Sequence, residues 1–184
     1  MDFRVSREAF LRVLTHVSSI VDSRSTIPIL SNIYLKCENN QIEIRSTDMD
    51  ISIREFVSCD STKNGEATVN SRILTDIIRK TKKNSIVKCK LEGNRLIINS
   101  DNSVFELNAL SADEFPKFVP LDATNSFELT IPQMKRLFNK TKFAISAEET
   151  RYYLNGIYFH TVANGSKTSL RCVATDGHRL AKTE

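Results

Sequence analysis

The sequence of 184 residues contains no tryptophan and is poor in residues that interrupt regular structure, with five glycines and four prolines. This scarcity excludes a collagen-like chain and a disordered chain rich in glycine and proline. No apolar run approaches the roughly 20 residues that a membrane-spanning helix requires, and the opening segment MDFRVSREAF lacks the apolar stretch of a secretory signal. We therefore expect a soluble protein of the cytoplasm.

Motifs that carry catalytic chemistry are also missing. The cysteines are scattered without a CxxC pair, and the histidines lie too far apart for metal-ligand spacing. The sequence has no phosphate-binding glycine loop, no HExxH motif and no glycine elbow around a serine. These absences argue against a metal site, a cofactor and an enzyme. We expect the cysteine side chains to be small buried hydrophobic groups. The cysteines are Cys37, Cys59, Cys89 and Cys172.

The charge of the chain is nearly balanced. The net charge of +4 and the pI near 8.9 permit an anionic partner without requiring one. Basic residues concentrate on two predicted helices, where a solvated face is the commoner interpretation and a phosphate-binding surface the alternative. These residues are Arg72, Arg79, Lys80, Lys82 and Lys83 on or after the first of the two, and Lys135, Arg136, Lys140 and Lys142 on or near the second.

A pattern of strand, helix and further strands is repeated along the chain. Each copy has a predicted helix with an apolar face, and Ser6, Asn70 and Thr130 are the expected N-caps. Pro132 falls in the first turn of the third helix, where a missing N–H costs nothing. The predicted strand segments are 29–37, 41–47 and 50–58 in the first copy, 85–101 and 103–111 in the second, and 152–161 and 169–181 in the third.

The repeats predict an α+β fold with helices on one face of antiparallel sheets. Two copies make one domain, so residues 1–120 are expected to form a complete first domain and residues 121–128 a linker. Residues 129–184 would then be only the N-terminal part of a second domain. A half domain with an open sheet edge is an implausible natural end. We therefore expect the chain to be an N-terminal fragment of a longer protein.

Two segments of the third copy are candidate sites. In TDGHRL, Asp176 and His178 could be an acid/base pair of an enzyme, part of an exposed binding surface, or simply a β-turn in which Asp176 accepts backbone N–H bonds and Gly177 has a positive φ. In RYYLNG, adjacent tyrosines at the start of a strand would point to opposite faces. They could stack on bases or form an ordinary strand edge. A sequence-specific DNA-binding module is disfavoured because no helix-turn-helix arrangement is present.

Four motifs together resemble a known family. IPILSNI, ADEFP, RYYLNG and VATDGHRLA, in one register from Met1 to the last residues, are similar to the β subunit of bacterial DNA polymerase III, the sliding clamp family. The resemblance implies three domains of DNA-clamp fold, each built from two βαβββ units. It also implies a homodimeric ring around duplex DNA, helices inward and sheets outward. Such a ring is a processivity factor for DNA replication, without cofactor or catalytic activity.

The resemblance implies a role for specific residues. Proteins such as the polymerase catalytic subunit and the clamp loader would dock a short apolar motif in a cleft whose far wall lies beyond Glu184. The implied cleft residues are Leu154, Thr175, Gly177, His178, Arg179 and Leu180. The implied DNA-binding residues are Arg24, Tyr152, Tyr153, Arg72, Arg79, Arg136 and Lys140, with Glu148 and Glu149 placing opposing negative charge beside the tyrosines. Phe105 and Leu107 would be apolar contacts between protomers.

Overall fold

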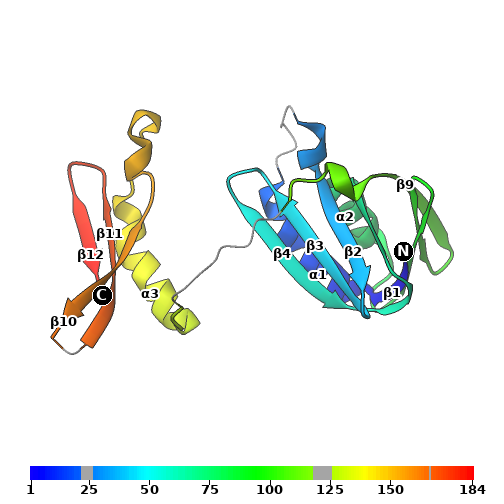
Figure 1. The fold of residues 1–184 in the computed structure, drawn as a ribbon, viewed down its shortest axis with the longest axis horizontal. Helices are drawn as coiled ribbons and strands as arrows, with labels where there is room; N and C mark the ends of the chain where they lie inside the picture. The colour runs from blue at the N-terminus through cyan, green and yellow to red at the C-terminus, as the bar shows by residue number, and fades with distance from the viewer. Residues whose placement is uncertain (22–26, 118–125, 166) are drawn as a thin grey trace. The chain divides into compact units, whose positions relative to one another are not determined.

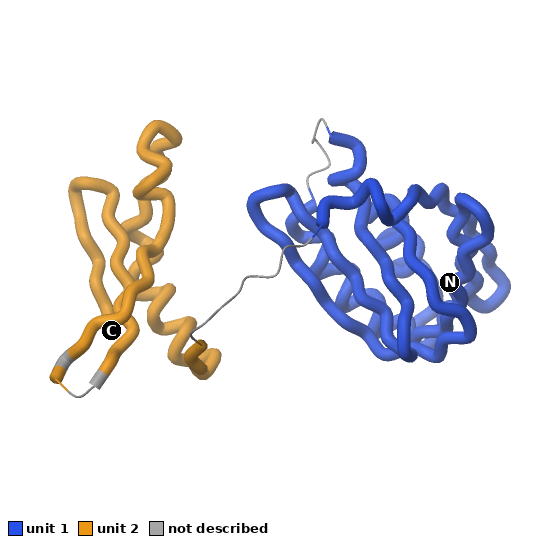
Figure 2. Tube along the Cα trace, in the orientation of Figure 1, with its two compact units in different colours: residues 1–120 blue, residues 121–184 orange. Residues whose placement is uncertain are grey.

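The computed structural model describes residues 1–21, 27–117, 126–165 and 167–184. It divides into two compact units, Met1–Pro120 and Leu121–Glu184, each described here by itself (Figure 2). No helix in the described ranges is long and apolar enough to cross a membrane.

Unit 1 is an antiparallel sheet structure with helices on one face. The strands follow the order β4-β3-β2-β6-β9-β8-β7-β1-β5, and in Figure 1 both α-helices lie behind them. The helices are α1 (Arg7–Val17) and α2 (Ser71–Lys80), with short 3₁₀ helices η1 (Ser18–Ile20), η2 (Pro28–Ser31) and η3 (Ala112–Glu114). The strands are β1 (Asp2–Ser6), β2 (Asn32–Glu38), β3 (Gln41–Thr47), β4 (Ser52–Ser58), β5 (Asp60–Lys63), β6 (Gly65–Asn70), β7 (Ile86–Glu92), β8 (Arg95–Ser100) and β9 (Ser103–Leu110).

The two repeats of unit 1 exchange their leading strands. The first strand of the first repeat, β1, pairs with β7 of the second repeat, with Val5 opposite Val87. The leading strand of the second repeat, β6, pairs with β2 of the first repeat, with Val69 opposite Ile33. Each repeat therefore completes the sheet of the other. This exchange is the physical reason why two copies make one compact unit.

The helices follow the predicted apolar periodicity. Phe10, Leu14 and Val17 on α1 are buried, as are Leu74 and Ile78 on α2. The Phe10 ring meets the Phe3 ring of β1 edge to face, with centroids 6.2 Å apart. Asn70 caps α2 as predicted, because its side chain accepts a hydrogen bond from the Ile73 N–H at 3.0 Å. Ser6 occupies the N-cap of α1, but its hydroxyl makes no capping bond.

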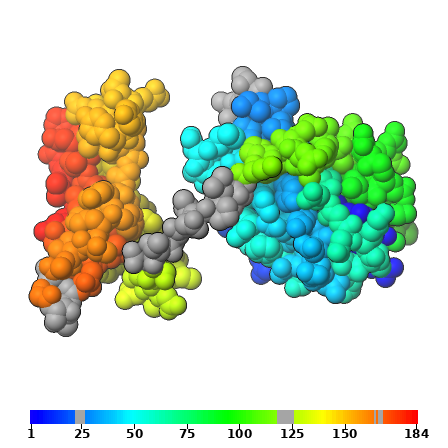
Figure 3. All heavy atoms as spheres, in the orientation of Figure 1, coloured from blue at the N-terminus to red at the C-terminus, as the bar shows by residue number. Residues whose placement is uncertain are grey.

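The segment after β9 packs back onto the sheet. It forms η3 and runs across the surface of unit 1, as the green and yellow-green strip in Figure 3 shows. Phe115 is buried, and the centroid of its ring lies 5.8 Å from the centroid of the Tyr34 ring on β2. The Tyr34 hydroxyl donates to the Glu66 carboxylate. The Phe of the ADEFP motif is therefore a core residue that anchors the chain where it leaves unit 1.

The thiols are buried and free, as the sequence predicts. Burial raises the pKa of Cys59 to about 12 and raises the pKa of Cys89 and of Cys172. The Sγ atoms of Cys37 and Cys59 lie 4.0 Å apart, in a weak thiol hydrogen bond and not in a disulfide. All four side chains therefore contribute packing rather than reactivity.

Unit 2 consists of one helix on a three-stranded antiparallel sheet of order β10-β11-β12. Its elements are α3 (Ile131–Thr141), η4 (Lys142–Ala144), η5 (Glu149–Leu154), β10 (Tyr158–Asn164), β11 (Lys167–Thr175) and β12 (Leu180–Thr183). Thr130 caps α3 as predicted, in a reciprocal capping box with Gln133. The core is small and contains Ala144, Ala174 and Ala181.

The leading segment of the third repeat, residues 126–130, forms no strand. In unit 1, each leading strand pairs with a strand of the neighbouring repeat. The part of the chain that the structure describes holds no further repeat with which residues 126–130 could pair. Residues 126–130 therefore differ from the leading segments of unit 1, which are strands.

Candidate functional site

The turn between β11 and β12 is held by its own side chains. The Asp176 Oδ1 atom accepts hydrogen bonds from the backbone N–H of His178 at 3.0 Å and of Arg179 at 2.9 Å. The Thr175 hydroxyl donates to the Arg179 carbonyl at 2.7 Å and accepts from the Gly177 N–H at 3.1 Å. Gly177 has a φ of +89°, in the region that favours glycine. The predicted β-turn is confirmed.

The same network occurs in unit 1, in the turn between β3 and β4. Asp48 accepts from the N–H groups of Asp50 and Ile51 at 3.0 and 2.7 Å. The Thr47 hydroxyl donates to the Ile51 carbonyl at 2.9 Å and accepts from the Met49 N–H at 3.0 Å. Met49 has a φ of +83°. The Thr-Asp network is therefore part of the repeat, and any special role of the second turn must come from the side chains it carries.

The electrostatics of Asp176 favour a structural role over acid/base catalysis. The backbone N–H groups of Arg179 and His178, followed by the Arg179 guanidinium, lower the pKa of Asp176 to about 2. A carboxylate with this pKa stays ionised at neutral pH and is a poor proton donor or acceptor there. The hydrogen bonds of the Asp176 carboxylate go to the backbone of the turn and to the Arg179 side chain, not to the His178 ring.

The depressed pKa of Asp176 gives a pH prediction. The ordinary pKa of the carboxyl is 3.8. Because the folded value is lower, the stabilisation from the turn is complete above the ordinary value and is lost as the pH falls through about 2. Carboxyl carbon chemical shifts of Asp176, measured by NMR from about pH 1.5 to about pH 6, check this, because that range includes both the ordinary and the lowered pKa. In Arg179→Ala the pKa should rise only part of the way, because the backbone donors remain. Titration of wild-type Asp176 near its ordinary value would contradict the prediction.

Five of the predicted cleft residues, Thr175 and Gly177 to Leu180, lie in or directly beside this turn, and Leu154 ends helix η5. Leu180 is 66% exposed at the start of β12, beside Gly177, His178 and Arg179. The turn also touches η5, the helix that ends at Leu154. A Cβ atom on Gly177 would lie 3.1 Å from Nη1 of Arg151, so glycine gives this guanidinium room to approach. The arrangement offers exposed apolar carbon, backbone groups and two guanidinium groups to a ligand.

Phe143 is a further residue beside this turn, and the motifs of the sequence did not indicate it. The structure places it on η4, 57% exposed, with the Arg179 guanidinium carbon 5.8 Å above its ring centroid. The two residues are far apart in the chain, so no local pattern could have joined them.

The expectation of a strand at RYYLNG is wrong. Arg151 to Leu154 belong to the 3₁₀ helix η5, which is kinked at Arg151. Tyr152 and Tyr153 therefore do not point to opposite faces of a sheet. They are 79% and 71% exposed, and their rings lie 5.8 Å apart, edge to face. Both rings are accessible to a ligand.

The charges near the tyrosines are partly compensated. The Glu148 carboxylate lies 3.0 Å from Nε of Arg151 in an ion pair, whereas Glu149 is exposed. The repulsion of DNA that is expected from these two glutamates is therefore reduced at Glu148.

The other predicted DNA-binding residues lie on helices and are exposed. Arg72 and Arg79 are on α2, and Arg79 forms an ion pair with Asp76 at 2.7 Å. Arg136 and Lys140 are on α3, and Arg136 donates to the carbonyl of Glu184. Arg24 lies outside the described residues.

The predicted contacts between protomers lie on β9. This strand pairs with β8 from Ser103 to Asn108 and with β6 at Ala109 and Leu110. Leu107 is buried and Phe105 packs against the core, so the accessible parts of β9 are its backbone edge and its outward side chains, such as Val104. A hollow of about 430 Å³ beside this edge is lined in part by Ile73, Leu107 and Leu110. The role of Phe105 and Leu107 in ring closure stays a prediction.

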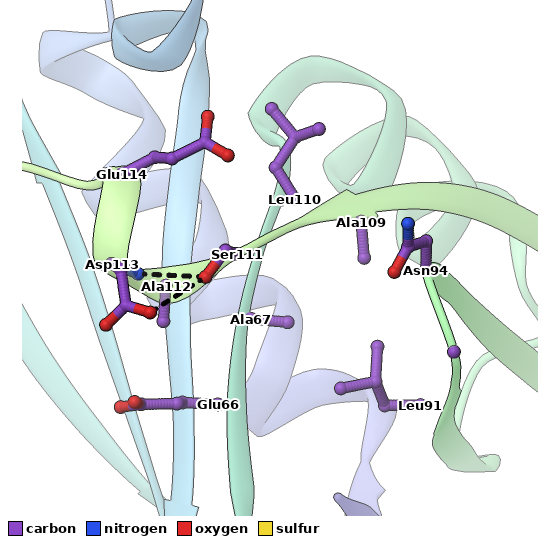
Figure 4. Close-up of a pocket in the computed structure, with 11 residues that line it drawn as sticks. Glu66, Ala67, Leu91, Asn94, Ala109, Leu110, Ser111, Ala112, Asp113 and Glu114 are labelled. Carbon is purple, nitrogen blue, oxygen red and sulfur yellow. Dashed lines mark hydrogen bonds between the residues drawn. The ribbon is translucent and has the colours of Figure 1, made fainter.

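A second hollow of unit 1, of about 400 Å³, lies beside η3. Figure 4 shows Ala67, Ala109 and Leu91 directed into it, with the bond between Ser111 and Asp113 at its rim. Within the described ranges, no group of three or more His, Cys, Asp or Glu side chains is arranged to hold a metal ion. This hollow therefore presents small apolar groups edged by carboxylates rather than a metal centre.

Comparison with known families decides the identity of the chain. The family model of the DNA polymerase III beta subunit, N-terminal domain, matches residues 1–119, and that of the central domain matches residues 128–184. The chain belongs to the DNA polymerase III beta-subunit family. The predicted family is therefore confirmed.

Individual sliding clamps agree with this assignment. The beta sliding clamp of Caulobacter vibrioides is 41% identical over 186 residues, which cover 100% of this chain and 50% of that protein. The clamp of Pseudomonas aeruginosa is 35% identical over 182 residues, 98% of this chain and 48% of its own length. The chain thus spans about half the length of these curated relatives.

Solved clamp structures confirm the predicted clamp fold. The pol III beta structure of Caulobacter crescentus has a TM-score of 0.93 at 41% identity, covering 99% of this chain and 49% of that one. A clamp from Bartonella birtlesii bound to griselimycin has a TM-score of 0.93 at 40% identity, with the same coverage.

Proposed function

We propose that the protein containing this chain is a ring-shaped sliding clamp that encircles duplex DNA and tethers the replicative polymerase during replication in the cytoplasm. The observation that carries the proposal is the match of the whole chain, in register, to two successive domains of the beta subunit. The protein is a processivity factor with no catalytic activity of its own. Residues 1–120 form its first domain, 121–128 a linker, and 129–184 the beginning of the second domain.

The DNA contacts in this proposal are numerous, weak and indifferent to sequence. Lysine and arginine side chains on helices bind phosphates without reading bases, which allows the protein to slide. Arg72, Arg79, Arg136 and Lys140 would make such contacts, together with Arg24 and the exposed rings of Tyr152 and Tyr153. The modest net charge of +4 suits a clamp that is retained by topology rather than by affinity.

The turn at Thr175–Leu180, with Leu154, would dock a short apolar peptide from the polymerase, the clamp loader or other clamp-binding proteins. The exposed Leu180 and the half-buried Leu154 provide apolar carbon that suits such a peptide. The free backbone edge of β9, backed by Phe105 and Leu107, would pair with a strand of the second protomer.

Topological binding has a direct test. Full-length protein is loaded by a clamp loader on nicked circular DNA and separated from free protein by gel filtration. When a restriction enzyme linearises the circle, most of the bound protein should leave through the ends. Uncut circles, and linear DNA with blocked ends, should retain it. Retention on linear DNA with open ends would exclude encirclement.

A further inference from the structure

Arg179 is held in one orientation by two contacts. Its Nε donates to Oδ2 of Asp176 at 2.8 Å, while the other oxygen of that carboxylate accepts the turn N–H groups. Its guanidinium carbon lies 5.8 Å above the Phe143 ring. One contact fixes the guanidinium within its plane and the other supports its face.

Phe143 is itself firmly placed, although it is exposed. It lies between Thr141 and Ala144, both fully buried. The Thr141 hydroxyl donates to the Leu137 carbonyl at 2.8 Å. Ala144 packs with Ala174 and Ala181, which are on the two strands that flank the turn. The aromatic ring and the turn are therefore supported by the same small core.

Unit 1 provides an internal comparison. In both units a 3₁₀ helix directly follows the main helix, so Ser19 in η1 corresponds to Phe143 in η4. In the equivalent Thr-Asp turns, Ile51 corresponds to Arg179. The turn network is common to both units, but the aromatic ring and the arginine occur together only in the second. The pair is thus an addition to the turn and not a requirement for forming it.

We propose that Phe143 is a positioning residue of the docking site, which holds the Arg179 guanidinium ready for carbonyl or carboxylate oxygens of an apolar peptide. This inference rests on the proposed peptide-docking function of the turn. An arginine that is already stacked loses less side-chain freedom on binding. A cation–π contact at an exposed site corresponds to about a two- to five-fold change in affinity.

A double-mutant cycle on the full-length protein tests the inference, with a fluorescent peptide of the apolar polymerase C-terminal tail as the probe. Phe143→Leu should weaken binding by about two- to five-fold, and Phe143→Tyr should preserve it. In the Arg179→Ala background, Phe143→Leu should cause no further loss. Phe138→Leu is the matched control, because this exposed ring contacts Phe159 and not Arg179.

The outcomes separate this inference from the proposed function. An equal loss from Phe143→Leu in both backgrounds would show that Phe143 acts independently of Arg179 and would overturn the inference. The inference would also be overturned if Phe143→Leu bound the peptide with wild-type affinity while Leu154→Ala bound it more weakly. Wild-type binding by Leu154→Ala would instead count against the docking function itself. Thermal unfolding of each variant distinguishes a binding effect from a loss of folded protein.

Discussion

Phe10→Ala should lower the free energy of unfolding of unit 1 by about 3–5 kcal/mol. Phe10 is fully buried on α1 and packs edge to face on Phe3. Phe3 belongs to β1, which pairs with β7 of the second repeat. Removing the Phe10 ring therefore leaves a cavity between the helix of one repeat and the sheet of the other, where close-packed neighbours can relax only partly.

Urea denaturation followed by circular dichroism measures this loss. Val104→Ala is the control, because Val104 is 64% exposed and its truncation should change stability by less than about 0.5 kcal/mol. A loss below about 1 kcal/mol for Phe10→Ala would contradict the packing of α1 described here.

Leu180→Asp should weaken peptide docking to the full-length protein by about thirty-fold or more. Leu180 is an exposed apolar side chain beside the Gly177 turn. A bound apolar peptide would cover it, so an aspartate in its place would have to lose its hydration without a partner. Fluorescence anisotropy with the labelled polymerase-tail peptide measures the effect.

The counterpart turn in unit 1 supplies the control for Leu180→Asp. Met49 is 63% exposed and occupies the position equivalent to Gly177, within the same hydrogen-bond network. Met49→Asp introduces the same charge on that turn and should leave docking unchanged. A similar loss from both variants would mean that added negative charge, rather than loss of an apolar contact, weakens binding.

The helices and turns were predictable because local chemistry determines them. Asn70 and Thr130 cap their helices through their own side chains, and Asp176 holds its turn through the backbone N–H groups of His178 and Arg179. The prediction of a strand at Tyr152 and Tyr153 is wrong because it was based on the average preference of aromatic residues for strands. The 3₁₀ conformation there depends on short-range backbone bonds, such as Asn155 N–H to the Tyr152 carbonyl.

Contacts between distant segments were not predictable from residue patterns. Nothing in the sequence of β1 shows that it pairs with β7, because the partner is chosen by the closure of the whole unit. The short strand β5, with sequence DSTK, has no apolar alternation to reveal it. The stacking of Arg179 on Phe143 likewise depends on how η4 and the β11–β12 turn meet in the folded unit.

The strand exchange of unit 1 sets the order in which the chain can mature on the ribosome. The pairing of Asp2 with Lys90 cannot form until the β7 segment has been made. At roughly 5–20 residues per second, the N-terminal strand waits several seconds for this partner, while β5, which pairs with its other edge, is made earlier. During that time its apolar residues, Phe3 and Val5, need protection from wrong pairing. The rate of synthesis thus sets how long these two residues are exposed to wrong pairing before β7 is available.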